Sequence, residues 1–468
     1  MEYWTGGVVQ DLLYVIVLLA LASGLRHAIA PMRKLGVPDA LVAGALGMAL
    51  GPSGVDLLPF SSARLELVIY HLLAIVFIGV TLQSPPTGKA GGAARSIAFA
   101  IPAVAVLQCF VGMACVYGWN LARGGPELHT GFAMLVPLGY NQGPGQAMAL
   151  GGAWEQQAGF SHGAQLGLII AASGLFWCCV IGVVLVAWAR KRGWDRTLGP
   201  LDTATSDDAA SVVKPPYKHA RLALLGDLEP LTTQLVAVAL VYLITWITLD
   251  NLSPFMPEKF RATLWGFHFL IASLFAMAIR PLAHRLPAGN PLDDDLLGRI
   301  SSTAVDVATC AAISAVKIEI LTNYLWPILI AGTVAGVVTM YACLWMARRA
   351  FPTEPFAHAL ITYGSLTGTA ATGLALLRML DPQLEGTAAR NYVLSVTPSA
   401  ALGLPLFVLM QKPVLGFPGD YPSEMLITGA MLVAYLAILI VVWRLFSPLR
   451  FTRPLWKLWP DPEPDDKP

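Results

Sequence analysis

Long apolar blocks separated by short polar connections dominate the chain. Ten of these blocks form two sets of five, one before and one after a polar segment at 190–229. A helix needs about 20 mostly apolar residues to cross a bilayer, so we predict a membrane-spanning helix in each block. The first set covers 8–25, 37–50, 65–82, 98–119 and 164–189. The second set covers 231–249, 263–279, 300–321, 325–346 and 392–410, and an eleventh helix is predicted at 425–446.

The composition is that of a membrane protein. Of 468 residues, 56% are hydrophobic and 13% are charged, with a mean hydropathy of +0.63, whereas a typical soluble domain has about 25% charged residues. The net charge of +1 provides no field that would attract nucleic acid. All six cysteines lie in apolar blocks, where a thiol behaves as a small hydrophobe, so we predict neither disulfides nor a metal site. The first block has no basic leader and is interpreted as a retained span, not a signal peptide.

Basic residues are distributed unevenly among the polar connections. When the connections are assigned alternately to the two sides of a membrane, most of the 30 Lys and Arg residues fall on the side of the 190–229 segment. The positive-inside rule makes that side cytoplasmic. We therefore expect a multi-pass protein of the bacterial inner (plasma) membrane with its N-terminus outside and its C-terminus in the cytoplasm. The first set of blocks begins outside and the second begins inside, so the two sets have opposite topology.

Two glycine-rich, polar and uncharged stretches interrupt the apolar pattern at matching places. They occupy 139–146 and 364–372, each between the fourth and fifth blocks of its set. The same spacing of two glycines occurs in both: Gly139 with Gly143, and Gly364 with Gly368. Irregular backbone at membrane depth must line a cavity or be buried in protein, because hydrocarbon offers no hydrogen bonds. We predict re-entrant loops over about 131–154 and 356–380 that meet near the midplane. Alternatively, these glycines form tight turns or close contacts in ordinary spans.

The predicted fold is an all-α membrane protein of two inverted five-span repeats, each with a re-entrant hairpin loop, plus one extra C-terminal span. The expected organisation is a first repeat at 1–189, a cytoplasmic linker at 190–229, a second repeat at 230–410, and the extra helix with a cytoplasmic tail at 411–468. Such paired broken helices are typical of secondary transporters.

The two stretches carry groups suited to a small charged solute. In the first, amides accompany glycines that allow a ligand to approach the backbone closely. In the second, hydroxyls accompany carbonyl groups, and uncharged oxygen ligands suit a hard cation such as sodium. Helix N-termini at the tips would favour a carboxylate. The candidate substrate-binding residues are Asn141, Gln142, Gly143, Gly145, Gln146, Gly368, Thr369 and Thr372.

The candidate ligands of a coupling cation are Ser365, Thr367 and Asp306. Asp306 lies within the 300–321 block, and carboxylates inside membranes commonly have a functional role. A span that begins a few residues later would instead leave Asp306 at the interface. Ser and Thr in membrane helices also often bond to a carbonyl of the preceding turn, which is the alternative role of both hydroxyls. We expect no cofactor other than sodium as the coupling ion.

Five segments, taken in order, carry a resemblance to a known family. They are LGVPDALVAG at 35–44, LAIVFIGV at 73–80, the first glycine stretch, VKIE at 316–319 and the second glycine stretch. In this order they resemble the bacterial sodium/glutamate symporter family over most of the chain. The resemblance implies sodium-driven symport of glutamate or a related small anionic amino acid, elevator-like alternating access and a homodimer. It matches Gly143, Gly145 and Gly368 with glycines of the family's loops.

The chain departs from the family's pattern at polar positions of both loops. Gln142 and Pro144 replace a His and a Thr in the first loop, and Ala371 replaces a proline in the second. Changing the hydrogen-bonding groups of a buried pocket alters its selectivity strongly. A sodium- or proton-coupled carrier of di- or tricarboxylates or another organic anion, with the same fold, is therefore the main alternative.

Two further function classes are less consistent with the sequence. A membrane enzyme would be expected to show a recognisable catalytic pattern, and the chain has no His-Glu-x-x-His helix, no phosphate-binding glycine loop ending in Lys-Ser or Lys-Thr, and no Cys/His cluster. A passive channel usually has rings of charge or a carbonyl filter repeated by subunits. Two unlike loops in one chain favour alternating access instead.

Overall fold

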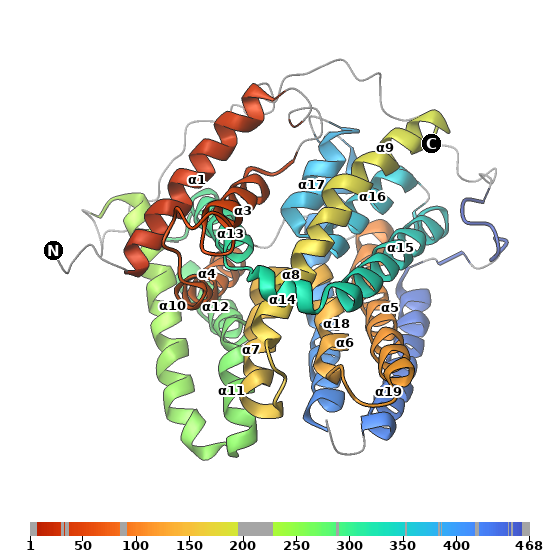
Figure 1. Ribbon diagram of the computed structural model, residues 1–468. Helices are drawn as coiled ribbons and strands as arrows, with labels where there is room; N and C mark the ends of the chain where they lie inside the picture. The colour runs from red at the N-terminus through yellow and green to blue at the C-terminus, as the bar shows by residue number, and fades with distance from the viewer. Residues whose placement is uncertain are drawn as a thin grey trace.

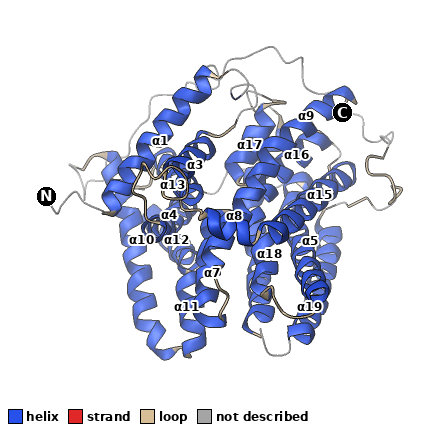
Figure 2. Ribbon diagram, viewed as in Figure 1, coloured by secondary structure: helices blue, strands red, loops and turns tan. Residues whose placement is uncertain are grey.

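The part of the chain that the structure describes consists of helices joined by loops, and it contains no strand (Figure 2). The computed structural model describes residues 7–29, 32, 37–84, 91–194, 228–286, 290–351, 353–381, 384, 386–416, 421–447, 449–450 and 453–460. Most of the predicted linker at 190–229 and the end of the tail lie outside these residues. Nine of the described helices are long and apolar enough to cross a membrane. The prediction of an all-α, multi-pass membrane protein is therefore confirmed.

In chain order, the helices fall into three consecutive sets. The first is α1 (Val8–Ala28), α3 (Asp39–Leu50), α4 (Ser62–Leu82) and α5 (Gly92–Arg123). The second is α6 (Thr130–Pro137), the π-helix η2 (Leu138–Gln142), α7 (Pro144–Ala158), α8 (Gly163–Phe176), the π-helix η3 (Trp177–Ile181) and α9 (Gly182–Lys191). The third is α10 (Pro230–Leu252), η5 (Ser253–Phe255), α11 (Glu258–Gly266), α12 (His268–His284), α13 (Asp294–Ser314), α14 (Ile318–Asn323), α15 (Leu325–Ala350), α16 (Pro355–Thr367), α17 (Ala370–Arg378), α18 (Thr387–Leu415) and α19 (Tyr421–Phe446).

Three predicted spans differ from the observed helices. The 37–50 block forms α3, whose 12 residues extend about 18 Å and are too short to cross a bilayer core alone. The 263–279 block is split into α11 and α12 at Phe267. The 300–321 block is shifted, because the carboxylate of Asp293 accepts hydrogen bonds from the first N–H groups of α13 and starts that helix earlier.

Helix α13 also ends earlier than predicted, because side chains from distant parts of the chain bond to the backbone groups that follow its last residue. The amide of Gln165 donates to the carbonyl of Ala315 at 3.2 Å and accepts from the N–H of Lys317 at 3.0 Å. The hydroxyl of Ser53 donates to the carbonyl of Val316 at 2.9 Å. These bonds stabilise a break that hydrophobic periodicity alone does not reveal.

The helices gather in two groups with α7 and α8 between them (Figure 1). One group contains α1, α3, α4, α10, α12 and α13, and in it α4 and α13 pack against each other. The other contains α5, α15, α16, α18 and α19, and in it α5 contacts α15, α18 and α19. Between the groups, α7 packs on α8 and touches both α4 and α18.

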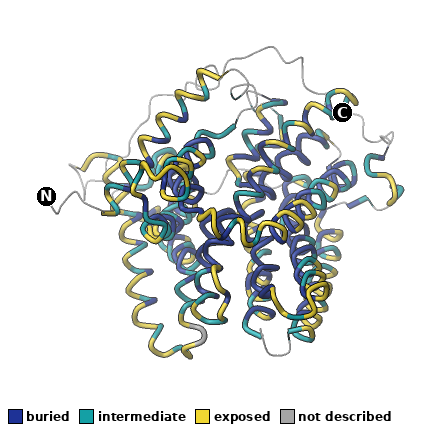
Figure 3. Tube along the Cα trace, in the orientation of Figure 1, coloured by how far each residue is buried: buried dark blue, intermediate teal, exposed yellow. Residues whose placement is uncertain are grey.

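Burial is concentrated in the interior helices, and the peripheral ones have more exposed residues (Figure 3). In the most apolar window of α5, 72% of residues are buried, against 22% in α1, α10 and α19. The exposed residues of α1 include Val9, Ile16 and Leu21. Apolar side chains on the outside of an apolar helix bundle are expected to face lipid, which agrees with the membrane assignment.

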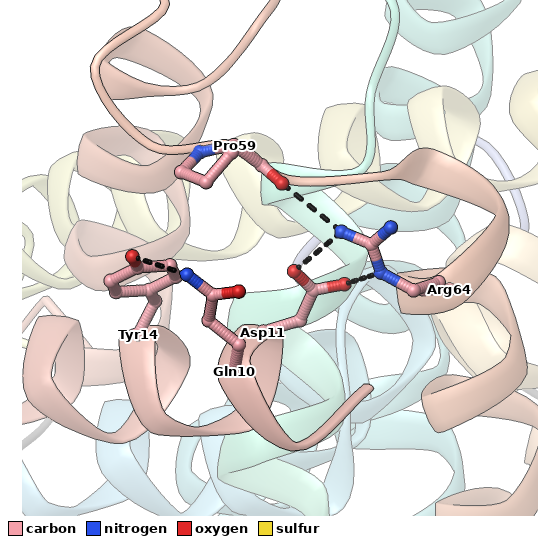
Figure 4. A network of polar contacts seen from close by, with 5 residues as sticks. All are labelled: Gln10, Asp11, Tyr14, Pro59 and Arg64. Atoms are coloured by element: carbon pink, nitrogen blue, oxygen red, sulfur yellow. Dashed lines mark hydrogen bonds and ion pairs between the residues drawn. The ribbon is translucent and has the colours of Figure 1, made fainter. Parts of the chain in front are cut away.

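An ion pair fixes the start of α1 against α4 (Figure 4). The guanidinium of Arg64 donates from Nε to one oxygen of Asp11 at 2.6 Å and from Nη2 to the other at 3.0 Å. It also donates to the carbonyl of Pro59 at 3.1 Å. The Asp11 side chain is 1% exposed, whereas Arg64 is 28% exposed. The two-pronged contact therefore compensates a buried carboxylate.

Replacing Arg64 by Ala is expected to lower the free energy of unfolding by roughly 1–3 kcal/mol, because Asp11 stays buried without its cation. The matched control is Arg123→Ala, which breaks a pair with Glu127 whose side chains are 55% and 54% exposed. That change is expected to cost less than about 0.5 kcal/mol. Thermal unfolding of the purified protein in detergent measures both, and equal effects would contradict the role given to Arg64.

Candidate solute site at two broken helices

The first glycine stretch forms a break between α6–η2 and α7. Helix α6 passes into η2, and the chain then reverses at Gly143, which has φ +86° and ψ −179°. This backbone conformation is essentially restricted to glycine. Pro144 occupies the first position of α7, where its missing N–H is tolerated. The sequence Gly-Pro therefore ends one helix and starts the next within a single residue.

The second glycine stretch forms a break between α16 and α17. Helix α16 ends at Thr367, and Gly368 and Thr369 are non-helical before α17 begins at Ala370. The hydroxyl of Thr369 accepts from the N–H of Thr372 at 3.3 Å, and the hydroxyl of Thr372 accepts from the N–H of Thr369 at 2.8 Å. This reciprocal cap satisfies the start of α17 with its own side chains.

The two breaks lie against each other. A Cβ atom placed on Gly143 would be 3.6 Å from Cγ2 of Thr369 and 3.9 Å from the carbonyl oxygen of Gly368. Helix α8 passes the same place, because a Cβ on Gly174 would lie 2.7 Å from the carbonyl oxygen of Thr367 and 3.2 Å from the ring of Tyr140. Helices α7 and α17 therefore begin close to each other, with Gly143 and Gly368 buried and Ala370 exposed.

The polar groups at this point are uncharged. Neither 139–146 nor 364–372 contains a charged residue. Gln146, in the first turn of α7, is 1% exposed; its Nε2 donates to Oε1 of Gln142 at 3.1 Å, and its Oε1 has no hydrogen-bond partner among the described atoms. Asn141 and Gln142 are partly exposed. A buried amide oxygen without a donor is costly unless water or a ligand bonds to it.

The hydroxyls proposed as cation ligands bond to their own helix. Ser365 donates to the carbonyl of Thr362 at 3.0 Å, and Thr367 donates to that of Tyr363 at 2.9 Å. This is the alternative role that the sequence left open. Because each hydroxyl has used its proton on a carbonyl, only the lone pairs of its oxygen remain, and these can accept a bond or ligate a cation.

Side chains from neighbouring helices hold the two breaks in place. On α5, Nε2 of Gln108 donates to the carbonyl of Leu366 and to Oγ1 of Thr339, both at 2.9 Å. The hydroxyl of Tyr140 donates to the carbonyl of Gly332 at 2.7 Å. The bonds of Gln108 join the second break to α5 and α15. The bond of Tyr140 joins the first break to α15.

Most of the predicted site residues lie on the two breaks, but Asp306 does not. Gly143, Gly368 and Thr369 meet directly, while Gly145 packs against Leu73 of α4. Asp306 is an exposed residue of α13, which packs mainly on α3 and α4. The structure therefore does not bring Asp306 together with the glycine breaks.

Two residues of the site escaped the sequence analysis. Gln108 stands alone as an amide in the apolar run 98–119, and an isolated polar residue in such a run is a usable signal. Tyr140 precedes the predicted ligands and gave no separate signal, since a tyrosine within an apolar segment is ordinary. Its role depends on the position of Gly332, almost 200 residues later in the chain.

The fold and these breaks define a class of protein: a multi-pass helical membrane protein with two interrupted helices that meet in its interior. Comparisons with known proteins add no narrower identity. No family model, curated protein or solved structure matches the chain. The resemblance noted in the sequence stays a prediction, and the function has to be argued from the site.

Replacing Gln108 by Leu is expected to lower the free energy of unfolding by roughly 1–3 kcal/mol, because the carbonyl of Leu366 and the hydroxyl of Thr339 lose their donor in a buried site. Thr339→Val removes one of the same bonds. The double variant is expected to lose less than the sum of the single variants, with a coupling of about 0.5–1.5 kcal/mol. Thermal unfolding of the two single variants and the double variant in detergent measures this coupling. Strict additivity would show that the amide of Gln108 does not bridge α5 and α15.

Proposed function

We propose that the chain is a secondary active transporter that couples sodium to the uptake of glutamate or a related small anionic amino acid by alternating access. The observation that supports this most is the meeting of two helix breaks, one from each half of the chain, at Gly143 and at Gly368–Thr369. Paired interrupted helices at an internal point are the usual setting of substrate and ion sites in such carriers.

The start of α7 suits a carboxylate. A helix N-terminus has about half a positive charge and N–H groups without intrahelical acceptors. No side chain caps α7, whereas Thr369 already caps α17. The amides of Asn141, Gln142 and Gln146 add donors and acceptors nearby. An anion at this point would need no buried cation, which agrees with the uncharged breaks.

The end of α16 suits the coupling cation. The last carbonyl groups of a helix have partial negative charge, and α16 ends at Thr367 beside the break. The oxygens of Ser365 and Thr367 lie in the same turn and retain lone pairs. Uncharged oxygen ligands from carbonyls and hydroxyls are appropriate for sodium.

The packing of the helices supports an inverted repeat. If α1–α9 correspond to α10–α18, then α3 and α12 are equivalent, as are α4 and α13. The structure has both α3 on α13 and α12 on α4, and both α1 on α3 and α10 on α12. The hairpins also form an equivalent pair of contacts, because α6 packs on α5 in one half and α16 packs on α15 in the other. Such reciprocal pairs are expected when one unit occurs twice with opposite topology.

The same proposal includes the cellular setting. The charge distribution supports a bacterial inner membrane, with the N-terminus outside and the C-terminus in the cytoplasm. The homodimer is proposed from the sequence resemblance alone.

Uptake by purified protein in proteoliposomes tests this function. We expect an inward sodium gradient to drive accumulation of labelled glutamate or aspartate, and dissipation of that gradient to abolish it. Labelled citrate and succinate, each with a sodium or a proton gradient, test the alternative carrier class. Accumulation of these acids without glutamate uptake would reject the amino-acid assignment, and gradient-independent leakage of all of them would reject the carrier.

The variant Gly143→Ala tests the first break. Its positive φ makes any side chain strained by roughly 1–3 kcal/mol, although the nearest atoms leave space for a methyl group. We expect uptake to fall by about tenfold or more. Gly124→Ala is the matched control, because Gly124 also has a positive φ, +75°, but has no atom near its Cβ position and lies at the end of α5. Equal uptake by the two variants, at equal expression, would show that the first break is not part of the solute site.

A further inference from the structure

An apolar groove lies between α5, α15 and α19, away from the helix breaks. Its volume is about 510 Å³, and all its lining side chains are apolar or aromatic. Its walls include Leu107 of α5, Val338 and Trp345 of α15, and Ile440 of α19, together with Leu449 and Leu458 from the segment after α19. Cavities of this size hold small-molecule ligands.

The groove is accessible from the face of the protein that is expected to contact lipid. Tyr341, which lines it, is 52% exposed. On α19, beside the lining residues, Ile438 and Val441 are exposed as well. A solute from water would have to cross this apolar surface, whereas an acyl chain already lies beside it.

One end of the groove is strongly basic. Two arginines end α15, one lies at the end of α19, and three basic residues occur in the segment that follows: Arg348, Arg349, Arg444, Arg450, Arg453 and Lys457. Neither α15 nor residues 444–460 contain Asp or Glu. These two segments therefore contribute six cations and no carboxylate of their own next to an apolar cavity.

Arg349 is a cation of the basic end that directly contacts a residue of the groove wall. Its guanidinium stacks 4.3 Å from the ring centre of Trp345, which lines the groove. Although it is only 1% exposed, its hydrogen-bond acceptors among the described residues are neutral carbonyls, those of Trp345, Pro454 and Lys457. Its Nε has no hydrogen-bond partner among the described atoms. Carbonyls satisfy donors but do not neutralise a charge, so an anion nearby would be favourable.

The basic end also has the features of a membrane interface. Trp456 is 85% exposed and Leu455 is 54% exposed, directly beside Lys457. Tryptophan is enriched where the headgroups of a bilayer begin. The groove thus extends from headgroup level toward the hydrocarbon interior.

We propose that this groove binds an anionic phospholipid, with an acyl chain along α5, α15 and α19 and the headgroup phosphate at the basic end. Basic pockets between membrane helices are suited to acidic headgroups, and here a chain-sized apolar cavity continues from the charges. The positive-inside bias explains cations at this side of the membrane but not the cavity that ends among them.

Native mass spectrometry of the full chain in detergent tests this site, with phosphatidylglycerol and phosphatidylcholine as probes. We expect phosphatidylglycerol to bind and phosphatidylcholine to bind at least about tenfold more weakly. A triple change of exposed or partly exposed cations, Arg444→Gln, Arg450→Gln and Lys457→Gln, is expected to weaken phosphatidylglycerol binding by about 100-fold, or about fivefold for each charge. Equal binding of both lipids would overturn the proposal.

Two further variants distinguish lipid binding in the groove from non-specific electrostatic attraction of the lipid to the protein. The control Lys191→Gln, Arg285→Gln and Arg299→Gln removes three cations from other helix ends and is expected to change binding by less than about threefold. Ala342→Trp fills the groove without changing the charge and is expected to abolish binding. Equal effects of the two triple variants, or unchanged binding by Ala342→Trp, would refute the site.

The acidic residues after Pro460 are the competing occupant. The sequence ends with Asp461, Glu463, Asp465 and Asp466, which lie outside the described residues. A chain that stops at Pro460 tests them. We expect it to bind phosphatidylglycerol no more than about threefold more tightly than the full chain. Binding that appears only after this truncation would show that the tail, and not a lipid, occupies the basic end.

Discussion

The constraint on which this structure depends is the hydrogen-bonding requirement of backbone groups in a membrane. An unbroken helix meets that requirement by itself, but a helix that stops inside the bundle leaves N–H and C=O groups at both new ends. The chain resolves this with side chains from other helices. Gln108 serves the end of α16, and the Thr369–Thr372 pair serves the start of α17. The breaks are possible only because the bundle surrounds them.

Close approach of the helices is the second condition for this arrangement. A Cβ on Gly139 would lie 2.8 Å from the backbone of α8, and one on Gly364 would lie 2.6 Å from Gly373 of the adjoining helix. Both distances are shorter than real contacts allow, so these two glycines are needed as spacers. Gly143 differs from them, because it has space for a side chain but a backbone conformation that only glycine adopts.

Much of the fold was predictable from local pattern, because an apolar block of sufficient length has few alternatives to a helix. The breaks were also predictable: Gly143 and Gly368 interrupt helices where the sequence indicated. What local pattern lacks is information on tertiary partners. The end of α13 is set by Gln165 and Ser53, which are distant in sequence, and the hydroxyls of Ser365 and Thr367 turned out to bond within α16. Asp306 was chosen because it is a carboxylate within a predicted span, and that pattern does not indicate which helices surround it.

If a solute binds at the breaks as proposed, the difference between the starts of α7 and α17 implies that the two hairpins would respond unequally to an empty site. Helix α17 has its own threonine cap, so its first turn is satisfied whether or not a solute is present. Helix α7 has no such cap and begins with a proline and a glycine. The N–H groups of its first turn must donate hydrogen bonds to water when nothing else is bound. Under the proposed function, loss of the solute would therefore act first on the hairpin of α6 and α7, which would make this hairpin the more sensitive of the two to occupancy.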